Sequence, residues 1–491
     1  MDSDCKFIET HWLTLAEKKY TDSPAFIIEK ENNSVEISYK EFSSMVKEAL
    51  FVLQEKGIRA KEYIPIIALN DINTIKTVFA LWFNGSIPVM INSNLKEEEE
   101  QSILSQFKFE SILTHSHLHE LNIIDKSQKI FIDKLDSNYN VTSLFSCSDF
   151  NLENDAIVIF TSGSSSKPKG VVHKFKSLLN SYLLGKNYFH YSQTDKWLLT
   201  LPIFHIGGFQ ILIRSLLSGS SVIVPESNNT DVLRCAIELH NPNFISMVPT
   251  QFKRLLEAGT NAPQRNKILL GGGKIETSLI DEGISKGWNP YKVYGSSETA
   301  AFISVLSPTN FKKHNYSAGE LLSEVKIEIL YDAEDESSGE IVIKSPTLFD
   351  RYLNDVNETS EKLINGKYFS GDYGFMSDNL LFIVNRRTDL IISGGENINP
   401  HEIEEVLLVH SDVKEVSVIG IPDEEWGEIV AAVIVPKNLE HINETEIKNF
   451  LKSKLTGYKI PKRIFFFETL PKTELGKIKR AELLSILEAL K

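Results

Sequence analysis

Short apolar runs alternate with amphipathic segments through the first part of the chain, and this alternation restricts the fold more than any other feature. Tyr63–Leu69 and Ile87–Ile91 have the length and composition of buried strands, and Ile75–Phe83 between them has apolar residues at helical spacing. Strands that alternate with helices form a mostly parallel sheet covered by helices. The sequence therefore predicts an α/β fold whose large N-terminal domain contains mostly parallel sheets.

The pattern changes near residue 385, which predicts a second domain. Beyond that point Pro400–Val409 has helical spacing, and two later apolar runs resemble strands. A chain of 491 residues, 42% of them hydrophobic, can fill more than one core. We expect a large N-terminal domain over residues 1–385 and a small α+β domain over residues 386–491.

Charge and cysteine content narrow the classes of partner and compartment. The net charge of −14 argues against general affinity for nucleic acids or anionic membranes. The three cysteines, Cys5, Cys147 and Cys235, are far apart, which suits a reducing compartment and offers no metal-ligand spacing. No apolar run approaches membrane-spanning length, and the first residues do not resemble a signal peptide. We expect a cytoplasmic protein without stable membrane insertion; its oligomeric state is left open, with a homodimer as one option.

A loop rich in glycine, serine and lysine, Ile159–Gly170, follows the apolar run Ala156–Phe160. Small residues after a strand let backbone N–H groups approach an anion, while the hydroxyls, Lys167 and Lys169 add donors and positive charge. Such a composition is also typical of a flexible linker. The spacing matches neither the P-loop nor the G-x-G-x-x-G motif. Binding of a polyphosphate is the favoured interpretation.

The loop resembles the T-S-G-[ST]-[ST]-G-x-P-K-G signature of the adenylate-forming superfamily, which includes acyl-CoA synthetases. Ser166 stands where that family usually has glycine. Six further stretches resemble the family's motifs and occur in the family's order: Leu201–His205, Gly271–Lys274, Tyr294–Thr299, Gly371–Asp372, Arg386–Asn397 and Pro471–Lys477. On these stretches the chain is identified as a member of the superfamily.

The stretch Tyr294–Thr299 combines an aromatic ring, small residues and an acid. Glu298 can supply the hard oxygen ligand that Mg²⁺ needs when it is shared with ATP phosphates. The ring of Tyr294 can lie against adenine, and Ser297 permits close approach of the backbone to a nucleotide. Taken alone, Glu298 would more often be an acid at a helix start; together with the other stretches, the metal interpretation is favoured.

Asp372 and His205 also allow two interpretations each. A carboxylate can accept from both hydroxyls of a ribose, although aspartate after glycine is common in turns. The resemblance implies that Asp372 contacts the ribose and that Arg386 lies on the ribose or phosphate side. A lone histidine is more often structural, but the resemblance implies that His205 positions and gates the carboxylate substrate rather than acting as a general base.

The resemblance implies that residues 1–385 form the AMP-binding domain and that residues 386–491 form a mobile domain carrying the catalytic lysine. By composition Lys477 lies in a solvated basic segment, but the family implies that it stabilises charge as the carboxylate attacks the α-phosphate. A pivot near Thr388 would place Gly394 and Gly395 beside the thiol tunnel. The family usually has Lys, Arg or Asp where this chain has Thr388, and Asn385 is a second departure.

The resemblance implies an ATP-dependent carboxylate–thiol ligase that uses ATP, Mg²⁺ and coenzyme A and forms an acyl-adenylate before the thioester. The alternatives are an adenylation enzyme that loads a carrier protein in trans and a catalytically silent nucleotide-binding protein; retention of Glu298 and Lys477 speaks against the second. A metallohydrolase is excluded, because His401-Glu402 lacks the second histidine of the zinc-binding motif four residues later. A serine hydrolase is excluded, because the sequence contains no G-x-S-x-G motif.

Within the superfamily, Leu201–Arg214, Lys267–Lys274 and Leu390–Asn397 look most like o-succinylbenzoate–CoA ligases of menaquinone synthesis. That substrate has a second carboxylate that needs a partner. Arg214 is the only basic residue in an apolar run, and a buried arginine is normally paired. Its partner could be the substrate or a nearby protein acid, and another aryl or fatty acid is the alternative substrate.

The expected catalytic residues are Lys477, His205 and Glu298, and Glu298 is also the expected metal ligand. The expected ATP-binding residues are Thr161, Ser162, Gly163, Ser164, Ser165, Lys169, Gly271, Gly272, Gly273, Tyr294, Gly295, Ser297, Asp372 and Arg386. Gly394 and Gly395 are expected to bind CoA, Thr388 to form the hinge, and Arg214 to contact the substrate.

Overall fold

The structure is a computed structural model that describes residues 10–30, 33–95, 97–118, 128–135, 148–161, 168–273, 275–332, 335–386, 391–393, 396–398, 400–423, 426–438, 442–455, 457–473, 476 and 478–489. The chain divides into two compact units. The first comprises Met1–Lys326 and Ile343–Tyr368, and the second comprises Ile327–Val342 and Phe369–Lys491. The second unit takes in strands before residue 386, and the expected domain boundary after residue 385 stays a prediction.

One sheet of the first unit has the strand order β15-β14-β13-β12-β11-β9-β10-β1-β2. Its strands are β1 (Pro24–Lys30), β2 (Asn33–Ser38), β9 (Lys196–Leu198), β10 (Ser221–Val224), β11 (Phe244–Met247), β12 (Lys267–Leu270), β13 (Pro290–Ser296), β14 (Ala301–Leu306) and β15 (Gly319–Leu321). The strands from β13 to β1 run parallel, and β2, β14 and β15 pair antiparallel at the two ends of this order. The mostly parallel sheet expected from the alternation of strands and helices is therefore confirmed.

The second sheet of this unit has the order β18-β8-β7-β4-β3-β5-β6. Its strands are β3 (Tyr63–Ala68), β4 (Ile87–Asn92), β5 (Ser111–Thr114), β6 (Gln128–Phe131), β7 (Asp155–Thr161), β8 (Lys169–Lys174) and β18 (Arg351–Tyr352). β7 pairs parallel with β4, while β8 returns antiparallel along β7, and β18 closes the edge antiparallel to β8. The sheet thus brings residues near 170 and 352 side by side.

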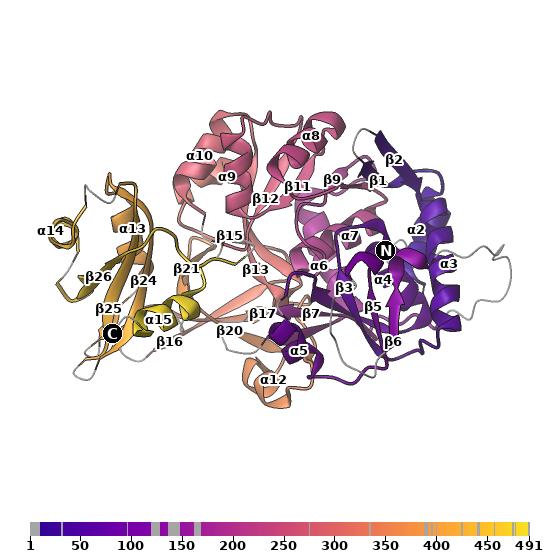
Figure 1. Cartoon of the computed structure of the whole chain (residues 1–491). Helices are drawn as coiled ribbons and strands as arrows, with labels where there is room; N and C mark the ends of the chain where they lie inside the picture. The colour runs from indigo at the N-terminus through magenta and orange to yellow at the C-terminus, as the bar shows by residue number, and fades with distance from the viewer. Residues whose placement is uncertain are drawn as a thin grey trace. The chain divides into compact units, whose positions relative to one another are not determined.

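Helices cover both sheets. They are α2 (Trp12–Tyr20), α3 (Tyr39–Glu55), α4 (Ile72–Asn84), α5 (Glu97–Leu104), α6 (Phe175–Phe189), α7 (Ile206–Ser218), α8 (Thr230–His240), α9 (Pro249–Glu257), α10 (Thr277–Ser285), α11 (Pro308–His314) and α12 (Val356–Lys362). Apolar residues of α8, α9 and α10 pack on β11 and β12 in one buried cluster, and Figure 1 shows these helices together beside the two strands. Within the part of the chain that is described, no helix is long and apolar enough to span a membrane.

Local sequence signals explain where several helices begin and end. The side chain of Ser38 accepts from Glu41 N, and the Glu41 carboxylate accepts from Ser38 N, which forms a capping box at the start of α3. Asp71 caps α4, and Gly85 ends that helix in the left-handed conformation. Apolar spacing predicts helices over Tyr39–Gln54 and Ile75–Phe83, and both are present, although α4 begins three residues earlier than predicted, after its cap Asp71.

The second unit contains β16 (Lys326–Asp332), β17 (Asp335–Lys344), β20 (Lys367–Ser377) and β21 (Leu380–Arg386), which neighbour one another in that order. It also contains a sheet of β23 (Glu396–Ile398), β22 (Ile391–Ser393), β25 (Gly427–Pro436) and β24 (Val413–Asp423), with β26 (Arg463–Phe466) paired to β25. Buried residues of α13 (Pro400–Leu408) and α14 (Glu444–Lys452) pack on one face of this sheet, and those of α15 (Arg480–Ala489) on the other. Figure 1 shows this arrangement, and the expected α+β class is confirmed.

Two local predictions are wrong. The sequence predicts a turn over Pro202–Gly208; a turn closed by His205 N and the Pro202 carbonyl is present, but it ends at His205 because α7 begins at Ile206. A Cβ at Gly208 would lie 2.2 Å from the Pro202 carbonyl oxygen, so the glycine lets the first helical turn pack directly on the preceding backbone. The charge run Lys96–Glu100 predicts the solvated start of a helix, but Glu100 is only 2% exposed. The helix expected there is present as α5, and its fourth residue faces the interior.

Candidate nucleotide and carboxylate site

Loops that follow neighbouring parallel strands line one edge of the larger sheet of the first unit. β9, β11, β12 and β13 lie side by side, so their carboxyl ends meet at the same edge. The predicted Gly271–Gly273 stretch follows β12 directly. Gly272 has φ of 74°, and a Cβ at Gly271 would lie 2.8 Å from a methyl group of Val293. Gly272 is therefore favoured by its left-handed backbone, and Gly271 by its close packing on Val293 of β13.

The turn that carries Glu298 is tightly built. After β13, residues Ser297–Thr299 form one short turn of helix, η3, and Ala300 and Ala301 both have positive φ, of 50° and 92°. A Cβ at Gly295 would lie 1.9 Å from the Ala301 carbonyl oxygen, so only glycine fits there. Left-handed backbone at two alanines is a strained arrangement that the surrounding structure must hold in place.

Glu298 itself is held from the segment near residue 350. The backbone N–H of Phe349 donates to the Glu298 carbonyl at 2.8 Å, and the Tyr352 hydroxyl donates to Glu298 Oε1 at 2.9 Å. Burial and then the negative charge of Glu298 raise the pKa of Tyr352, so the phenol remains a donor. None of the described residues donates a hydrogen bond to Oε2 of Glu298. That oxygen is therefore available to a cation.

His173, which sequence reasoning missed, supports the same turn from β8. Its Nε2 lies 2.7 Å from the Ser297 carbonyl oxygen, which can only accept, so Nε2 carries the proton. Burial lowers the pKa of His173 to about 4, against the opposing effect of this hydrogen bond. The ring is therefore neutral near pH 7. The only signal in the sequence was a histidine that follows two valines, which does not by itself indicate a partner.

Only the two ends of the predicted phosphate loop are described. Thr161 and Lys169 face each other in the pairing of β7 with β8. The predicted residues Ser162, Gly163, Ser164 and Ser165 lie outside the described residues. Lys169 Nζ lies 2.5 Å from Glu358 Oε1 of α12 and 5.7 Å from the centre of the Tyr352 ring. The strand β8 therefore connects the loop, the Glu298 turn and the segment around residue 355.

The bend before α7 holds His205 between two anchored ends. Asn70 donates from Nδ2 to the Leu201 carbonyl and accepts from Ile203 N, both at 2.9 Å. His205 directly precedes α7, is half-buried, and its ring lies 4.8 Å from that of Phe204. Asn70 was missed from the sequence because it is 131 residues from Leu201. The expected bend at His205 is present.

Arg214 lies inside the protein on α7. It is 1% exposed, and its guanidinium carbon lies 4.6 Å from the centre of the Phe302 ring. Neither Nε nor Nη2 has a hydrogen-bond partner among the described residues, and both amide atoms of Gln210, one turn earlier, are likewise buried without one. Burial lowers the pKa of Arg214. The protein acid considered as its partner is not found in the described ranges, and a buried cation without an anion is strongly unfavourable.

The predicted residues of the second unit are described only in part. Asp372 is 5% exposed on β20 and lies directly opposite Arg386 in the pairing with β21. Gly371 before it has φ of 71°. Thr388, Gly394, Gly395 and Lys477 lie outside the described residues.

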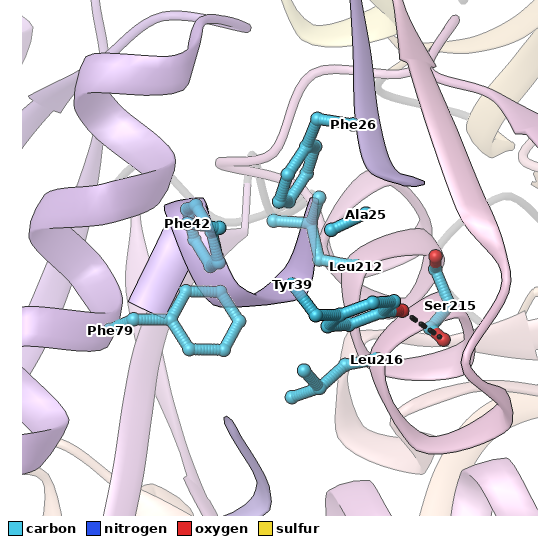
Figure 2. A pocket seen from close by; sticks show the side chains of 8 residues that line it. All are labelled: Ala25, Phe26, Tyr39, Phe42, Phe79, Leu212, Ser215 and Leu216. Carbon is cyan, nitrogen blue, oxygen red and sulfur yellow. Dashed lines mark hydrogen bonds between the residues drawn. The ribbon is translucent and has the colours of Figure 1, made fainter. Parts of the chain in front are cut away.

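A small apolar pocket in the first unit is a poor candidate for a ligand site. It encloses about 10 Å³, and its lining includes the rings of Phe26, Phe42 and Phe79. Figure 2 shows these rings around Tyr39, whose hydroxyl donates to the backbone of Ser215 at 3.1 Å. The space suits about one water molecule. We therefore assign it to core packing rather than to function.

Comparisons with known proteins agree along almost the whole chain. Residues 13–353 match the model of the AMP-binding enzyme family, and residues 402–477 match the C-terminal domain of AMP-binding enzymes. A 2-succinylbenzoate–CoA ligase of Listeria monocytogenes is 32% identical over 479 residues, which cover 96% of this chain and 98% of that protein.

Two solved structures of o-succinylbenzoate CoA synthetase (MenE) from Bacillus subtilis have similar folds. One, in complex with the acyl-adenylate intermediate OSB-AMP, has a TM-score of 0.86 at 29% identity and covers 97% of this chain and 98% of the other. The second, in complex with ATP and a magnesium ion, has a TM-score of 0.87 at 29% identity and covers 97% and 99%.

Proposed function

The chain belongs to the AMP-binding enzyme family, and from this premise we propose that it ligates o-succinylbenzoate, also called 2-succinylbenzoate, to coenzyme A. In the first step the carboxylate attacks the α-phosphate of ATP, which forms an acyl-adenylate and releases pyrophosphate. In the second, the thiol of CoA attacks the acyl carbon and AMP leaves. This activity would make the chain an AMP-forming acid–thiol ligase of menaquinone synthesis.

The residues of the first unit fit ATP and Mg²⁺. Gly271 and Gly295 let the loops after β12 and β13 pack closely, Gly272 has positive φ, and the neighbouring ring of Tyr294 is half-buried. We assign Tyr294, Ser297 and these glycines, with Gly273, to the nucleotide. Glu298 offers a carboxylate oxygen, the ligand type that Mg²⁺ prefers, and the ion would offset phosphate charge when bound.

We assign the phosphate contacts to residues of the first unit and the ribose contacts to two residues of the second. Thr161, Lys169 and the serines and glycine of the loop 162–165 would contact the phosphates. Asp372 and Arg386, which face each other across β20 and β21, would contact the ribose and its phosphate side.

The remaining residues are assigned to one or the other of the two reaction steps. We assign Lys477 to charge stabilisation during adenylation and His205 to positioning of the carboxylate. The domain boundary would follow residue 385, with Thr388 as the pivot, and Gly394 and Gly395 would approach CoA in the second step. Loading of a carrier protein instead of CoA is the second candidate, and it requires that CoA alone leaves the adenylate unconsumed.

The buried environment of Arg214 is the observation that supports o-succinylbenzoate as the carboxylate substrate. A buried guanidinium with Nε and Nη2 unpartnered in the described part of the chain needs an anion. A substrate with two carboxylates supplies one, because only one of them is activated. The rings of Phe302 and Trp197, 4.6 and 5.8 Å from the guanidinium carbon, are compatible with an aryl acid. A monocarboxylate would leave Arg214 without a partner.

The deciding experiment measures pyrophosphate release with ATP, Mg²⁺ and CoA over o-succinylbenzoate, benzoates and fatty acids. We expect o-succinylbenzoate to be preferred, and Arg214→Leu to raise its KM by about 100-fold or more, since the loss of a buried charge pair is worth about 3–5 kcal/mol. Arg214→Lys should recover part of the affinity. Arg234→Leu on α8 is the control, because that side chain is 39% exposed, and it should behave like the wild type.

Two results would contradict the proposal. Activity confined to monocarboxylates would exclude o-succinylbenzoate, and full o-succinylbenzoate activity in Arg214→Leu would remove Arg214 from the site. Consumption of the adenylate by CoA without any carrier protein separates the two candidate thiols. We further propose a cytoplasmic location, supported by the spacing of the cysteines and testable by cell fractionation.

A further inference from the structure

We propose that Tyr352 and Glu358 are positioning residues for ATP and its metal ion: Tyr352 orients Glu298, and Glu358 orients Lys169. The two side chains come from one short segment, residues 349–359, which the sequence analysis did not associate with chemistry. The inference rests on the proposed function, because it concerns the residues assigned above to Mg²⁺ and phosphate.

The segment is fixed to β8 through its backbone. Asp350 N donates to the Val172 carbonyl at 2.9 Å, and Leu353 N donates to the Gly170 carbonyl at 2.7 Å. Tyr352 N donates to the hydroxyl of Thr359 at 3.0 Å, which joins the strand β18 to the helix α12. The segment therefore has a defined register against the strand that carries Lys169.

Tyr352 contacts both candidate groups at once. Its hydroxyl donates to Glu298 Oε1 at 2.9 Å, and its ring lies 5.7 Å from Lys169 Nζ. The ring is 4% exposed and packs against Phe349 at 4.8 Å between centroids. A buried, packed donor on Oε1 fixes the direction of Oε2, the oxygen that receives no hydrogen bond from the described residues. Tyr352 is thus placed to aim the carboxylate at a cation.

Glu358 holds Lys169 in a similar way. Lys169 Nζ lies 2.5 Å from Glu358 Oε1, and the side chains of Lys169 and Glu358 are 24% and 19% exposed. The Glu358 N–H donates to Asp355 Oδ1 at 3.0 Å, which secures the start of α12 and so the place of Glu358. An ammonium group has three donors, so one can bind Glu358 while the others bind phosphate oxygens. A positioned lysine loses less conformational freedom when ATP binds than a free one does.

The alternative is that both contacts only stabilise the fold, and the readouts separate the two roles. We use Tyr352→Phe, which keeps the ring and removes the hydroxyl, and Glu358→Gln, which keeps the size and removes the charge. The matched controls are Tyr316→Phe and Glu361→Gln, because both side chains are exposed and Glu361 lies on the same helix. Binding of ATP is measured without any carboxylate, by equilibrium dialysis over a series of Mg²⁺ concentrations.

We expect Tyr352→Phe to raise the Mg²⁺ concentration for half-maximal ATP binding about tenfold, because a hydrogen bond to a charged group is lost. Glu358→Gln should weaken ATP binding about three- to tenfold at saturating Mg²⁺, and Glu358→Asp should restore part of it. In pyrophosphate release, the KM for ATP should rise more than kcat falls, while the KM for the carboxylate stays within about twofold, since neither residue contacts the acid.

Mg²⁺ and ATP dependences within twofold of the wild type in both variants would overturn the proposal. So would a loss of kcat that follows a lowered melting temperature with unchanged Mg²⁺ dependence. If Tyr352→Phe fails to fold, the Glu358 variants decide the result alone. The dialysis needs no carboxylate, so a wild-type protein that binds ATP but does not activate o-succinylbenzoate would refute the proposed substrate and leave this test intact.

Discussion

At the scale of single residues, the protonation state of the His173 ring affects the turn that carries Glu298. Its Nε2–H donates to the Ser297 carbonyl, one residue before Glu298. Burial lowers its pKa from 6.5 to about 4, which means that the folded protein resists protonation of a ring that the unfolded chain protonates readily. The Glu298 turn therefore depends on a neutral imidazole.

This dependence predicts a loss of stability in mild acid. Between pH 6.5 and about 4 the unfolded state binds more protons at this site, so the free energy of unfolding falls as the pH falls. The contribution is fully present above pH 6.5, and at most about 3 kcal/mol is lost near pH 4. Urea unfolding at pH 7 and pH 5 measures it.

The control is His173→Gln, whose amide N–H can replace the imidazole donor without titrating. Its free energy of unfolding should change less between pH 7 and pH 5 than that of the wild type. An identical pH dependence in the two proteins would show that His173 is not the titrating group.

At the scale of elements, the buried carboxylate of Glu404 links helix α15 to α13 and β24 in the second unit. Val418 N of β24 and Arg480 Nη2 of α15 both donate to Glu404 Oε1, at 2.8 and 2.9 Å. His401 lies 2.7 Å from Oε2 on the same helix, α13. Burial opposes ionisation, but the hydrogen bond from His401 and the charge of Arg480 outweigh it and lower the pKa of Glu404. One side chain thus joins three elements.

Replacement of Glu404 should loosen α15. We expect Glu404→Ala to destabilise the second unit by about 3–5 kcal/mol, because the buried ion pair with Arg480 and the hydrogen bond from Val418 N would be lost. Hydrogen exchange over α15 and chemical unfolding measure the change. Glu405→Ala, at an exposed neighbouring position, is the control. Unchanged protection of α15 in Glu404→Ala would mean that apolar packing alone holds the helix.

At the scale of the whole molecule, the proposed two-step reaction requires the C-terminal domain to serve adenylation and then thioester formation. Thr388→Pro should restrict the proposed pivot, because proline fixes φ, and should slow the thioester step more than adenylation. Pyrophosphate exchange measures the first step, and CoA consumption with supplied acyl-adenylate measures the second.

Lys477→Ala gives the opposite pattern under the same assays. It should lose adenylation, by the few kcal/mol of barrier that a positioned charge is typically worth, and spare the second step. Equal loss of both steps in Thr388→Pro would count against a hinge, and near-normal exchange in Lys477→Ala would remove that lysine from adenylation.

The sequence by itself determined the fold class and the position of the loops that carry the candidate site. The alternation of strands and helices is a local property, and it was enough to predict parallel neighbours such as β3 and β4. Glycine-rich segments after strands were enough to locate Gly271–Gly273 and the Glu298 turn, because close backbone approach and positive φ restrict the residue type at the position itself.

Only the tertiary structure decided which side chains meet. Tyr352 and Glu298 are 54 residues apart and Lys169 and Glu358 are 189 apart, so their contacts depend on where β18 and α12 lie against β8. The absence of an acid beside Arg214 within the described ranges could not be read from its apolar helix either. Periodicity reports which face of an element is buried, whereas the partner of a buried polar group is set by the order of strands that the chain brings together from distant positions.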